Sequence, residues 1–351
     1  MKKRSPLLWL IPLIVLLLLI PFVVPSSVSV AGAEEELPVY TPVELANPDP
    51  GPVPTEPATG KQPFDIVAYG PHPDAFGGYV KDLPYEYLDG TISVRIETRK
   101  IQNTRVLFTW VQIADPSQLR AQFSYPYPSE GTIYAHKLAL RERAVLLLNG
   151  DYCTGIRAGT VIRNGQEFRR VDAERYDQLI IDNNGDFHIL QRPLAAEFDA
   201  WQGKILHSFV FGPGLVIDGK LQEIGSESDY GSGMTFKKKA QRQAICQMDT
   251  LSYLIITTEG PDQSSGGGFT LYDFAQLVYD CGPVNAYNLD GGSSTYLIMG
   301  QTDANNPKNA KRINNSNGKN IRPITDAIYF VTAEPAPEPE LTPELIPETT
   351  P

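Results

Sequence analysis

The chain of 351 residues contains only three cysteines and four histidines. Cys153, Cys246 and Cys281 allow at most one disulfide within the chain, and no pair has the close spacing of a zinc site. A core of about 270 residues is large enough to be stable without a disulfide. We therefore predict buried free thiols that behave as small apolar side chains.

Histidine is too sparse to mark a Ser-His-Asp triad. His136 and His207 are predicted to be structural, and no nucleophile-elbow pattern surrounds the hydroxyls of residues 293–295. A triad is still open, because its members need not be neighbours in sequence.

Positive charge is also scarce. Of the net charge of −11, residues 1–33 carry +3 and the two acidic end segments −11, which leaves −3 on residues 61–332. Binding to a phosphate backbone needs a basic face, so we predict no nucleic-acid partner.

The N-terminal residues 1–33 resemble an export segment. Lys2-Lys3-Arg4 precedes an apolar run that ends at Val24, and Ala31-Gly32-Ala33 has the small-x-small pattern of a signal peptidase site. The run is also long enough for an uncleaved anchor. In both cases we predict an extracytoplasmic protein, secreted or anchored, that meets the membrane only through this segment.

Residues 34–60 and 333–351 contain 13 prolines and 11 acids but no base. Such segments bury too little apolar surface to offset chain entropy, so we predict a disordered acidic linker and tail. The part between them is predicted to be a single α+β catalytic domain, rich in β-structure, with mixed sheets and a few helices.

Strand and turn signals dominate that part. Apolar alternation predicts strands at residues 91–98 and 105–113. Asn164-Gly165, Asn184-Gly185 and Asp218-Gly219 predict hairpins within residues 161–171, 179–190 and 215–221. Helices are expected at residues 115–123, 132–143 and 270–282, and Thr270 with Asp273 forms a capping-box-like pair at the start of the last one.

The most informative stretch is Asn288-Leu289-Asp290-Gly291-Gly292-Ser293-Ser294-Thr295. Glycines let backbone amides approach a bound oxyanion, and Asp290 adds an acid, base or metal ligand. The alternative is a plain hairpin with strands at residues 286–289 and 295–299.

This stretch resembles the signature of the phosphodiester glycosidase family, as found in its bacterial exported members. Four other segments match the family in the same order: Leu148-Asn149-Gly150-Asp151-Tyr152, Phe211-Gly212-Pro213-Gly214-Leu215-Val216, Arg242-Gln243-Ala244-Ile245 and Arg322-Pro323-Ile324-Thr325-Asp326-Ala327. The resemblance implies a phosphodiester glycosidase-like domain at residues 131–332, preceded by a β-rich extension at residues 61–130. Two departures concern the site: Ser293 follows only two glycines, and Glu259-Gly260 stands where the family has Asp-Gly.

The resemblance implies hydrolysis of a glycosidic bond to phosphate in a cell-surface or extracellular glycan. Candidate catalytic residues are Asp290, Asp151 and Glu259, because a carboxylate must face the anomeric carbon. Arg242 and Arg322 suit the phosphate, since the guanidinium donates paired hydrogen bonds. The other candidate substrate-binding residues are Asn149, Gly150, Asn288, Gly291, Gly292, Ser293, Ser294 and Thr295. We expect Asp290 and Asp151 to lie across one pocket, with both arginines on the phosphate side.

No spacing determines a metal site or an oligomeric state. Asp290, Asp151, hydroxyls and glycine-loop carbonyls make Ca²⁺ the candidate cofactor. Two other functions remain open: a non-catalytic glycan-binding or cell-surface assembly module, and a metal-dependent phosphodiesterase.

Overall fold

A computed structural model describes residues 79–88, 91–230, 235–261, 267–300, 310–314 and 322–333. The predicted export segment and linker, and nearly all of the predicted tail, lie outside these residues. Within the described part, no helix combines the length and the apolar character needed to cross a membrane.

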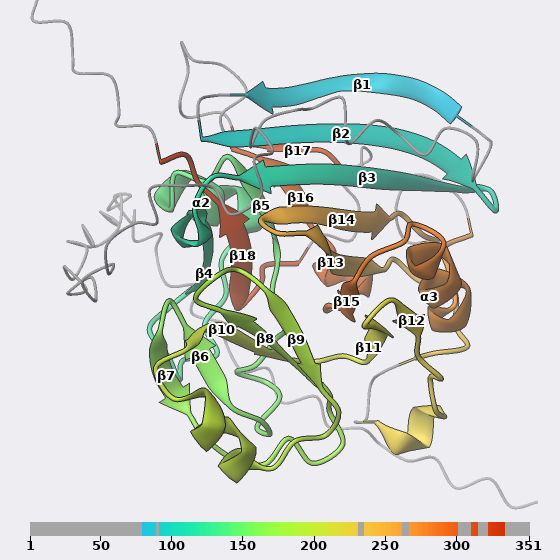
Figure 1. Ribbon diagram of the computed structural model, residues 1–351. Coiled ribbons are helices and arrows are strands. Elements are labelled where there is room, and N and C mark those ends of the chain that lie inside the picture. Colours follow the sequence, from blue (N-terminus) through green and yellow to red (C-terminus); the bar gives the residue numbers. More distant parts are fainter. Residues whose placement is uncertain are drawn as a thin grey trace, which may run out of the picture. The chain divides into compact units, whose positions relative to one another are not determined.

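The described strands form three sheets, of eight, five and five strands (Figure 1). The eight-stranded sheet has the order β1 (Tyr79–Leu88), β2 (Ile92–Ile101), β3 (Thr104–Ile113), β14 (Ser252–Thr258), β13 (Gln243–Asp249), β15 (Asn285–Asn288), β11 (Gly214–Ile217) and β12 (Lys220–Leu221).

The two smaller sheets are named after their central strands. The β10 sheet has the order β7 (Gln166–Arg169), β6 (Val161–Arg163), β10 (Ile205–Val210), β8 (Gln178–Asp182) and β9 (Phe187–Leu190). The β5 sheet has the order β17 (Lys311–Arg312), β16 (Leu297–Met299), β5 (Leu146–Asn149), β18 (Asp326–Phe330) and β4 (Leu119–Phe123).

The β-rich character with few helices is confirmed, but the expectation of mixed sheets is wrong for the described strands. Each neighbouring pair in the three sheets is antiparallel, for example β3 with β14 and β4 with β18. Parallel neighbours need a crossover connection, usually a helix, whereas hairpin turns join many of these strands directly. The strands β1 to β4, in the region predicted as an extension, pair within the same sheets as the family segments.

The hairpin predictions are confirmed. Asn164 and Gly165 have φ of 50° and 76°, and Asp218 and Gly219 have φ of 50° and 72°. Positive φ at both central residues is the requirement of a type I′ turn, whose twist matches that of the flanking strands.

One helix prediction is wrong. Pro116–Gln118 forms only a short 3-10 helix (η2), capped as expected by Asp115, and the chain then enters strand β4. Leu119 and Phe123 of β4 are buried while Arg120 is exposed, which is a strand alternation. Pairing with β18 therefore overrides the helix signal of Asp115-Pro116.

The other two helices are confirmed with shorter bounds. Helix α2 spans Ala135–Arg141, because Ile133 forms a β-bridge with Ile324 and so keeps residues 132–134 out of the helix. Helix α3 spans Leu271–Tyr279, and the Thr270 hydroxyl oxygen accepts the backbone N–H of Asp273 at 3.1 Å. The remaining described 3-10 helices are η3 (Ala195–Trp201), η4 (Glu227–Asp229) and η5 (Gly292–Ser294).

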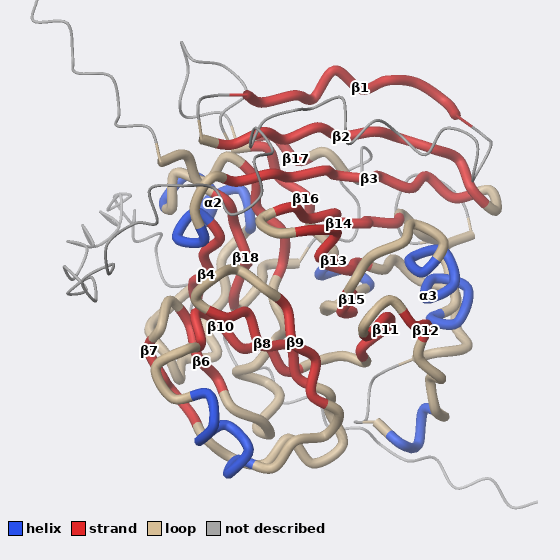
Figure 2. The backbone as a smooth tube through the Cα atoms, viewed as in Figure 1, coloured by secondary structure: helices blue, strands red, loops and turns tan. Residues whose placement is uncertain are grey.

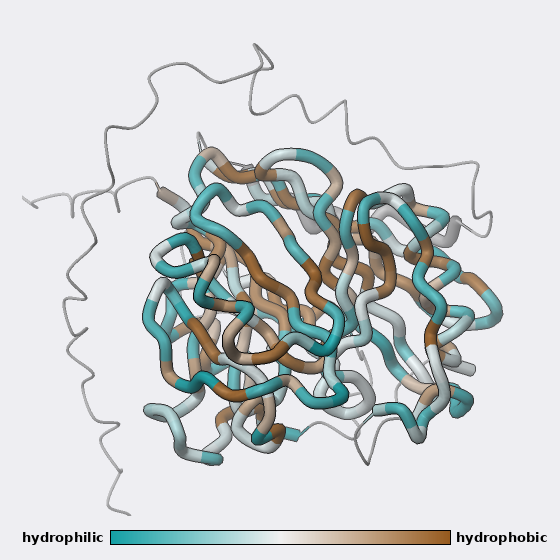
Figure 3. Tube along the Cα trace, turned by 60° about the horizontal axis from the view of Figure 1, so that its bottom comes forward, coloured by the Kyte–Doolittle hydropathy of each residue, from teal (hydrophilic) through white to brown (hydrophobic). Residues whose placement is uncertain are grey.

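The largest apolar cluster draws on all three sheets, with Leu107 and Ile255 from the eight-stranded sheet, Leu148 from the β5 sheet and Phe209 from the β10 sheet. Figure 2 shows the strands and the loops that connect them, and Figure 3 shows the hydrophobic and hydrophilic stretches along the same chain. Since one core joins the sheets, their loops are held in defined positions.

Cys153, Cys246 and Cys281 are free and buried, as predicted. His207 is buried too: its Nδ1 accepts the backbone N–H of Asn164 at 3.1 Å, and its Nε2 donates to Leu119 O at 2.9 Å. Burial lowers the pKa of His207 to about 3, so this histidine is a neutral structural residue.

Candidate functional site

The topology brings the family segments to one place. β13 is antiparallel to both β14 and β15, so the start of β13 lies beside the ends of its two neighbours. Likewise β5 is antiparallel to β16 and β18, so the end of β5 lies beside the starts of those strands. The segments at these two sheet edges are those that the sequence singled out.

Residues 289–296 link the two edges, and the hairpin alternative for this stretch is wrong. β15 pairs with β13 and β11 in the eight-stranded sheet, whereas β16 pairs with β5 and β17 in the β5 sheet. The two strands never pair with each other. The loop therefore passes between sheets, and Asp290 lies at their junction.

Asp290 and Arg322 form the charged pair of this junction. Nη2 of Arg322 lies 3.2 Å from Oδ2 of Asp290, and Nε of Arg322 donates to Ser294 Oγ at 2.6 Å. The Asp290 side chain is 16% exposed and that of Arg322 is 51% exposed. Asp290 is thus partly shielded, while the guanidinium remains open to a ligand.

Burial raises the pKa of Asp290 above its ordinary value. The Ser294 hydroxyl, the Arg322 charge and the backbone amide of Gly291 oppose this shift but leave the pKa raised. A carboxyl group whose pKa lies nearer to neutrality is better suited to proton transfer.

Two asparagines hold this loop by their side-chain amides. Asn149 donates from Nδ2 to Asp290 O at 2.7 Å and accepts the Tyr296 N–H at Oδ1 at 2.9 Å. Asn288 donates to the carbonyl of Gly212, within the Gly-Pro segment, at 2.8 Å. The structure places both asparagines near Asp290, where they bind backbone groups.

The glycines permit close backbone approach. A Cβ on Gly291 would lie 2.8 Å from Gln241 O, and a Cβ on Gly150 only 1.9 Å from Asp326 Oδ2. Gly292 has φ of 61° and donates its N–H to Gln241 O at 3.0 Å. Any side chain at Gly150 would displace the Asp326 carboxylate.

Three further predicted residues of this loop are located by the fold. Ser293 is partly exposed, and Ser294 and Thr295 are buried. The Thr295 carbonyl accepts from Asn314 Nδ2 at 2.7 Å, and the Ser294 hydroxyl accepts from Arg322 Nε at 2.6 Å.

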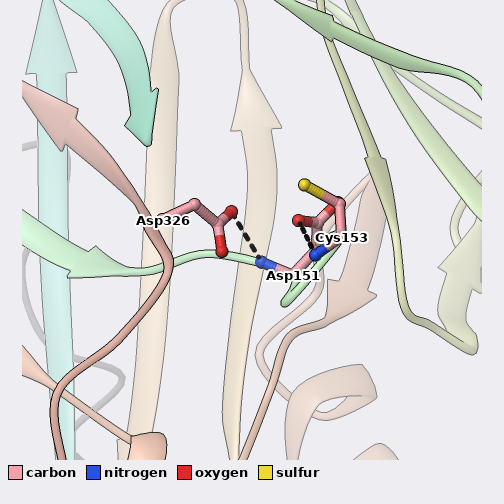
Figure 4. A group of neighbouring side chains, drawn as sticks. All are labelled: Asp151, Cys153 and Asp326. Atoms are coloured by element: carbon pink, nitrogen blue, oxygen red, sulfur yellow. Dashed lines mark hydrogen bonds between the residues drawn. The ribbon is translucent and has the colours of Figure 1, made fainter. Parts of the chain in front are cut away.

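Asp151 lies in a buried cluster with Cys153 and Asp326 (Figure 4). Its Oδ1 accepts from Arg163 Nη2 at 2.8 Å and from the Cys153 N–H at 3.1 Å, and its Oδ2 accepts the Val210 N–H at 2.6 Å. The carboxylate is fully buried, and its hydrogen bonds join the turn after β5 to strand β10.

Asp326 completes this cluster. It accepts the N–H groups of Asp151 and Tyr152, each at 3.1 Å, and Arg163 Nη2 lies 3.4 Å from its Oδ2. Burial and the neighbouring Asp151 raise the pKa of Asp326 to about 7, although Arg163 opposes the shift.

Asp151, Cys153 and Asp326 have the donor atoms of a cation site, all within 4.8 Å of one another. The guanidinium of Arg163 already neutralises this cluster, and its Nη2 also lies 3.6 Å from Cys153 Sγ. Burial raises the pKa of the Cys153 thiol far above its usual range, which makes it a poor metal ligand at neutral pH. These three residues do not fit the all-oxygen calcium site predicted from the sequence.

The two other predicted charged residues have partners of their own. Arg242 donates to the carbonyls of Phe269, Thr235 and Lys238 at 3.2, 2.5 and 2.9 Å, and burial lowers its pKa to about 10. Glu259 is fully buried and accepts from Arg105 Nη1 at 2.6 Å. The structure thus brings Arg322 to Asp290 but directs the Arg242 guanidinium to backbone carbonyls.

Arg163, Asp326 and Gln241 are not among the site residues predicted from the sequence. Asp326 stands inside a matched segment, and Arg163 directly precedes the Asn164-Gly165 turn. Gln241 precedes a matched segment, and both polar atoms of its buried amide lack a hydrogen-bond partner among the described residues. Only burial and contacts mark these residues, because no spacing rule selects them.

A family model described as phosphodiester glycosidase matches residues 142–331. The chain belongs to the phosphodiester glycosidase family. The match contains all the predicted site residues, and the resemblance stated from the sequence is confirmed.

Known proteins show how far this likeness extends. The SPbeta prophage-derived uncharacterized protein YomE of Bacillus subtilis (strain 168) is 29% identical over 168 residues, which is 46% of this chain and 25% of that protein. The chain therefore matches only a quarter of that relative's length.

Among solved structures, the catalytic domain of zebrafish N-acetylglucosamine-1-phosphodiester alpha-N-acetylglucosaminidase, auto-inhibited by its pro-peptide, has a TM-score of 0.52 and 14% identity, covering 72% of this chain and 86% of that one. A hypothetical protein from Synechocystis has a TM-score of 0.47 and 16% identity, covering 71% and 64%. The first likeness shows that this member of the phosphodiester glycosidase family shares the fold of that catalytic domain.

Proposed function

We propose that this member of the phosphodiester glycosidase family hydrolyses the glycosidic bond to phosphate in a sugar-1-phosphodiester. The observation that carries the proposal is the Asp290–Arg322 pair, with its N···O separation of 3.2 Å at the junction of two sheets. The Asp290 carboxylate can act on the anomeric carbon, and the Arg322 guanidinium can bind the phosphate.

The reaction needs stabilisation of positive charge on the sugar. A carboxylate facing the anomeric carbon can act as nucleophile or as base for water. Asp290 is a carboxylate that is partly shielded from solvent, so its charge acts on a substrate with less screening than in bulk water. Its backbone is held by Asn149, which keeps the carboxylate in place during the reaction.

Arg322 is suited to the leaving phosphate. Guanidinium donates parallel hydrogen bonds to phosphate oxygens, and this guanidinium is half exposed. Nε of Arg322 donates to Ser294 Oγ, and Nη2 donates one hydrogen bond to Asp290 Oδ2. A bound phosphate would compete with Asp290 for the guanidinium and leave the carboxylate free for the anomeric carbon.

Release of free sugar from methyl N-acetylglucosamine-1-phosphate tests the proposal with the full chain. We expect turnover by the wild type and a loss of at least about 100-fold in Asp290→Asn, since general acid–base groups contribute on this scale. Asp280→Asn is the matched control, because Asp280 is an exposed carboxylate after α3 whose side chain accepts a hydrogen bond from Gln276. Equal turnover by wild type and Asp290→Asn would remove Asp290 from the mechanism.

Hydrolysis in heavy-oxygen water distinguishes the two enzyme classes. Label in the sugar indicates C–O cleavage, as proposed, whereas label in the phosphate indicates a phosphodiesterase that cleaves P–O. Binding without release by the folded wild type would instead support a glycan-binding module. Chelator treatment in the same assay tests the candidate Ca²⁺, which we expect to be dispensable.

We propose that the substrate is a cell-surface or extracellular glycan. The support is the export-like segment at residues 1–33 together with the acidic, proline-rich residues 34–60. Retention of residues 1–33 in a purely cytoplasmic protein, measured by fractionation and N-terminal sequencing, would refute this location.

A further inference from the structure

Three exposed tyrosines stand in segments that are hydrogen-bonded to residues 324–326, a few residues after Arg322. Tyr125, Tyr134 and Tyr152 are 48%, 43% and 44% exposed. We call them the tyrosine rim. An exposed tyrosine is common by itself, so their shared position and the construction of Tyr152 carry the inference.

Each rim tyrosine belongs to a segment bonded to residues 324–326. The Ser124 N–H, next to Tyr125, donates to Thr325 O at 2.7 Å. Ile133, next to Tyr134, donates to Ile324 O at 3.1 Å. The N–H of Tyr152 itself donates to Asp326 Oδ1 at 3.1 Å. The three tyrosines therefore belong to segments that meet at one short stretch of chain.

This stretch continues directly from the site. Arg322, which pairs with Asp290, lies two residues before Ile324. From the other direction, the Asp290 N–H donates to Gly150 O at 3.4 Å, and Tyr152 follows two residues later. Two residues span at most about 7 Å, so the Tyr152 backbone lies within about 10 Å of Asp290.

Tyr152 is held in a costly conformation. Its φ of 59° is left-handed, which is rare for an aromatic residue. Its ring lies against Gly155, where an added Cβ would come within 2.2 Å of Tyr152 Cε1. A buried carboxylate fixes its amide, and its carbonyl accepts the N–H groups of Gly155 and Ile156 at 3.0 and 3.1 Å. Backbone strain at an exposed ring beside a site points to a role in binding.

We infer that the tyrosine rim binds the glycan attached to the phosphate, on the side of the scissile bond away from the reacting sugar. This inference rests on the proposed function. The phosphate joins the reacting sugar to a second group, and we assign the rim to that second group because the rim segments follow Arg322, the proposed phosphate ligand. Tyrosine combines a flat apolar face with a hydroxyl group, which matches a sugar ring. The favoured occupant is a neutral chain of equatorially substituted hexoses.

The test compares two phosphodiesters of N-acetylglucosamine with the full chain, one carrying a methyl group and the other cellotetraose. We expect the wild type to prefer the long substrate in kcat/KM, and Tyr152→Asn to reduce this preference about tenfold, the scale of one lost aromatic contact, which equals about 1.4 kcal/mol. Asparagine tolerates the left-handed backbone, so the variant keeps the fold. Tyr134→Ala should lower the preference in the same direction.

Tyr279→Ala is the matched control. Tyr279 is 40% exposed and ends α3, which lies on the opposite side from α2 in Figure 1. An unchanged preference in Tyr152→Asn, or an equal loss in Tyr279→Ala, would overturn the inference.

The experiment distinguishes failure of the proposed function from failure of the inference that the tyrosine rim binds a glycan. If the wild type releases no sugar from either compound, calorimetric binding of the cellotetraose compound decides: weaker binding by Tyr152→Asn retains the rim and rejects hydrolysis. Equal binding by both proteins, or none by either, rejects the rim.

Discussion

The carboxyl group of Asp326 should make the protein less stable as the pH rises through the weakly acidic range. Its pKa is raised from 3.8 to about 7, chiefly by burial and next by the charge of Asp151. The unfolded chain releases this proton near its ordinary pKa, whereas the folded chain retains it until about pH 7. Between these values the native state binds one more proton, so the free energy of unfolding falls as the pH increases.

The size of the effect follows from the width of this interval. Each pH unit is equivalent to about 1.4 kcal/mol, so the contribution of Asp326 should decrease by about 3 kcal/mol between about pH 5 and about pH 7.5. Above that range both states are deprotonated and the contribution is constant.

Urea unfolding of the full chain across this range is the assay, with Asp326→Asn measured in parallel. The difference in free energy between the two proteins isolates Asp326 from the other titrating groups. We expect the wild type to lose stability with pH relative to Asp326→Asn, and the exposed-site control Asp280→Asn to follow the wild type. Parallel curves for wild type and Asp326→Asn would refute the assignment.

A spectroscopic readout covers the case in which Asp326→Asn does not fold. The infrared carbonyl band of a protonated, buried carboxyl should be present in the wild type at about pH 5 and absent at about pH 9. A native protein without this band at the lower pH would contradict the raised pKa.

Two further substitutions test the geometry around the site, both by urea unfolding. Gly150→Ala places a Cβ 1.9 Å from Asp326 Oδ2 and should cost about 2 to 4 kcal/mol. Gly267→Ala, whose Cβ would have no atom of the described residues nearer than 3.9 Å, should change stability by less than about 1 kcal/mol. Equal effects would mean that the turn after β5 can move. Arg163→Met leaves two buried carboxylates without their cation and should cost about 3 to 5 kcal/mol, against less than about 0.5 kcal/mol for Arg157→Met, whose side chain is 85% exposed. A cost below about 1 kcal/mol for Arg163→Met would show that the carboxylates do not need this cation.

Local chemistry made much of the fold predictable. The hairpins at Asn164-Gly165 and Asp218-Gly219 follow from the positive φ that these residues tolerate. The start of α3 follows from a Thr270 cap, and the free buried thiols follow from the number of cysteines. Each of these depends on groups within a few residues of one another.

Pairing partners were not predictable in the same way. The Asp115-Pro116 signal is a good helix start, yet residues 119–123 form a strand because β18 supplies a partner more than 200 residues away in sequence. The strands on either side of Asp290 look like a hairpin but belong to different sheets. Local propensity contains no information about such distant hydrogen-bond partners.

The candidate site shows the same difference between local sequence features and distant partners. The sequence by itself determined the family, through the ordered motifs, and it predicted residues 288–295 as a site because a carboxylate stands there among glycines and hydroxyls. Only the tertiary structure decided that Arg322 pairs with Asp290 while Asp151 pairs with Arg163. The physical reason is that antiparallel pairing sets which strand ends meet, and burial sets which charges must be neutralised inside.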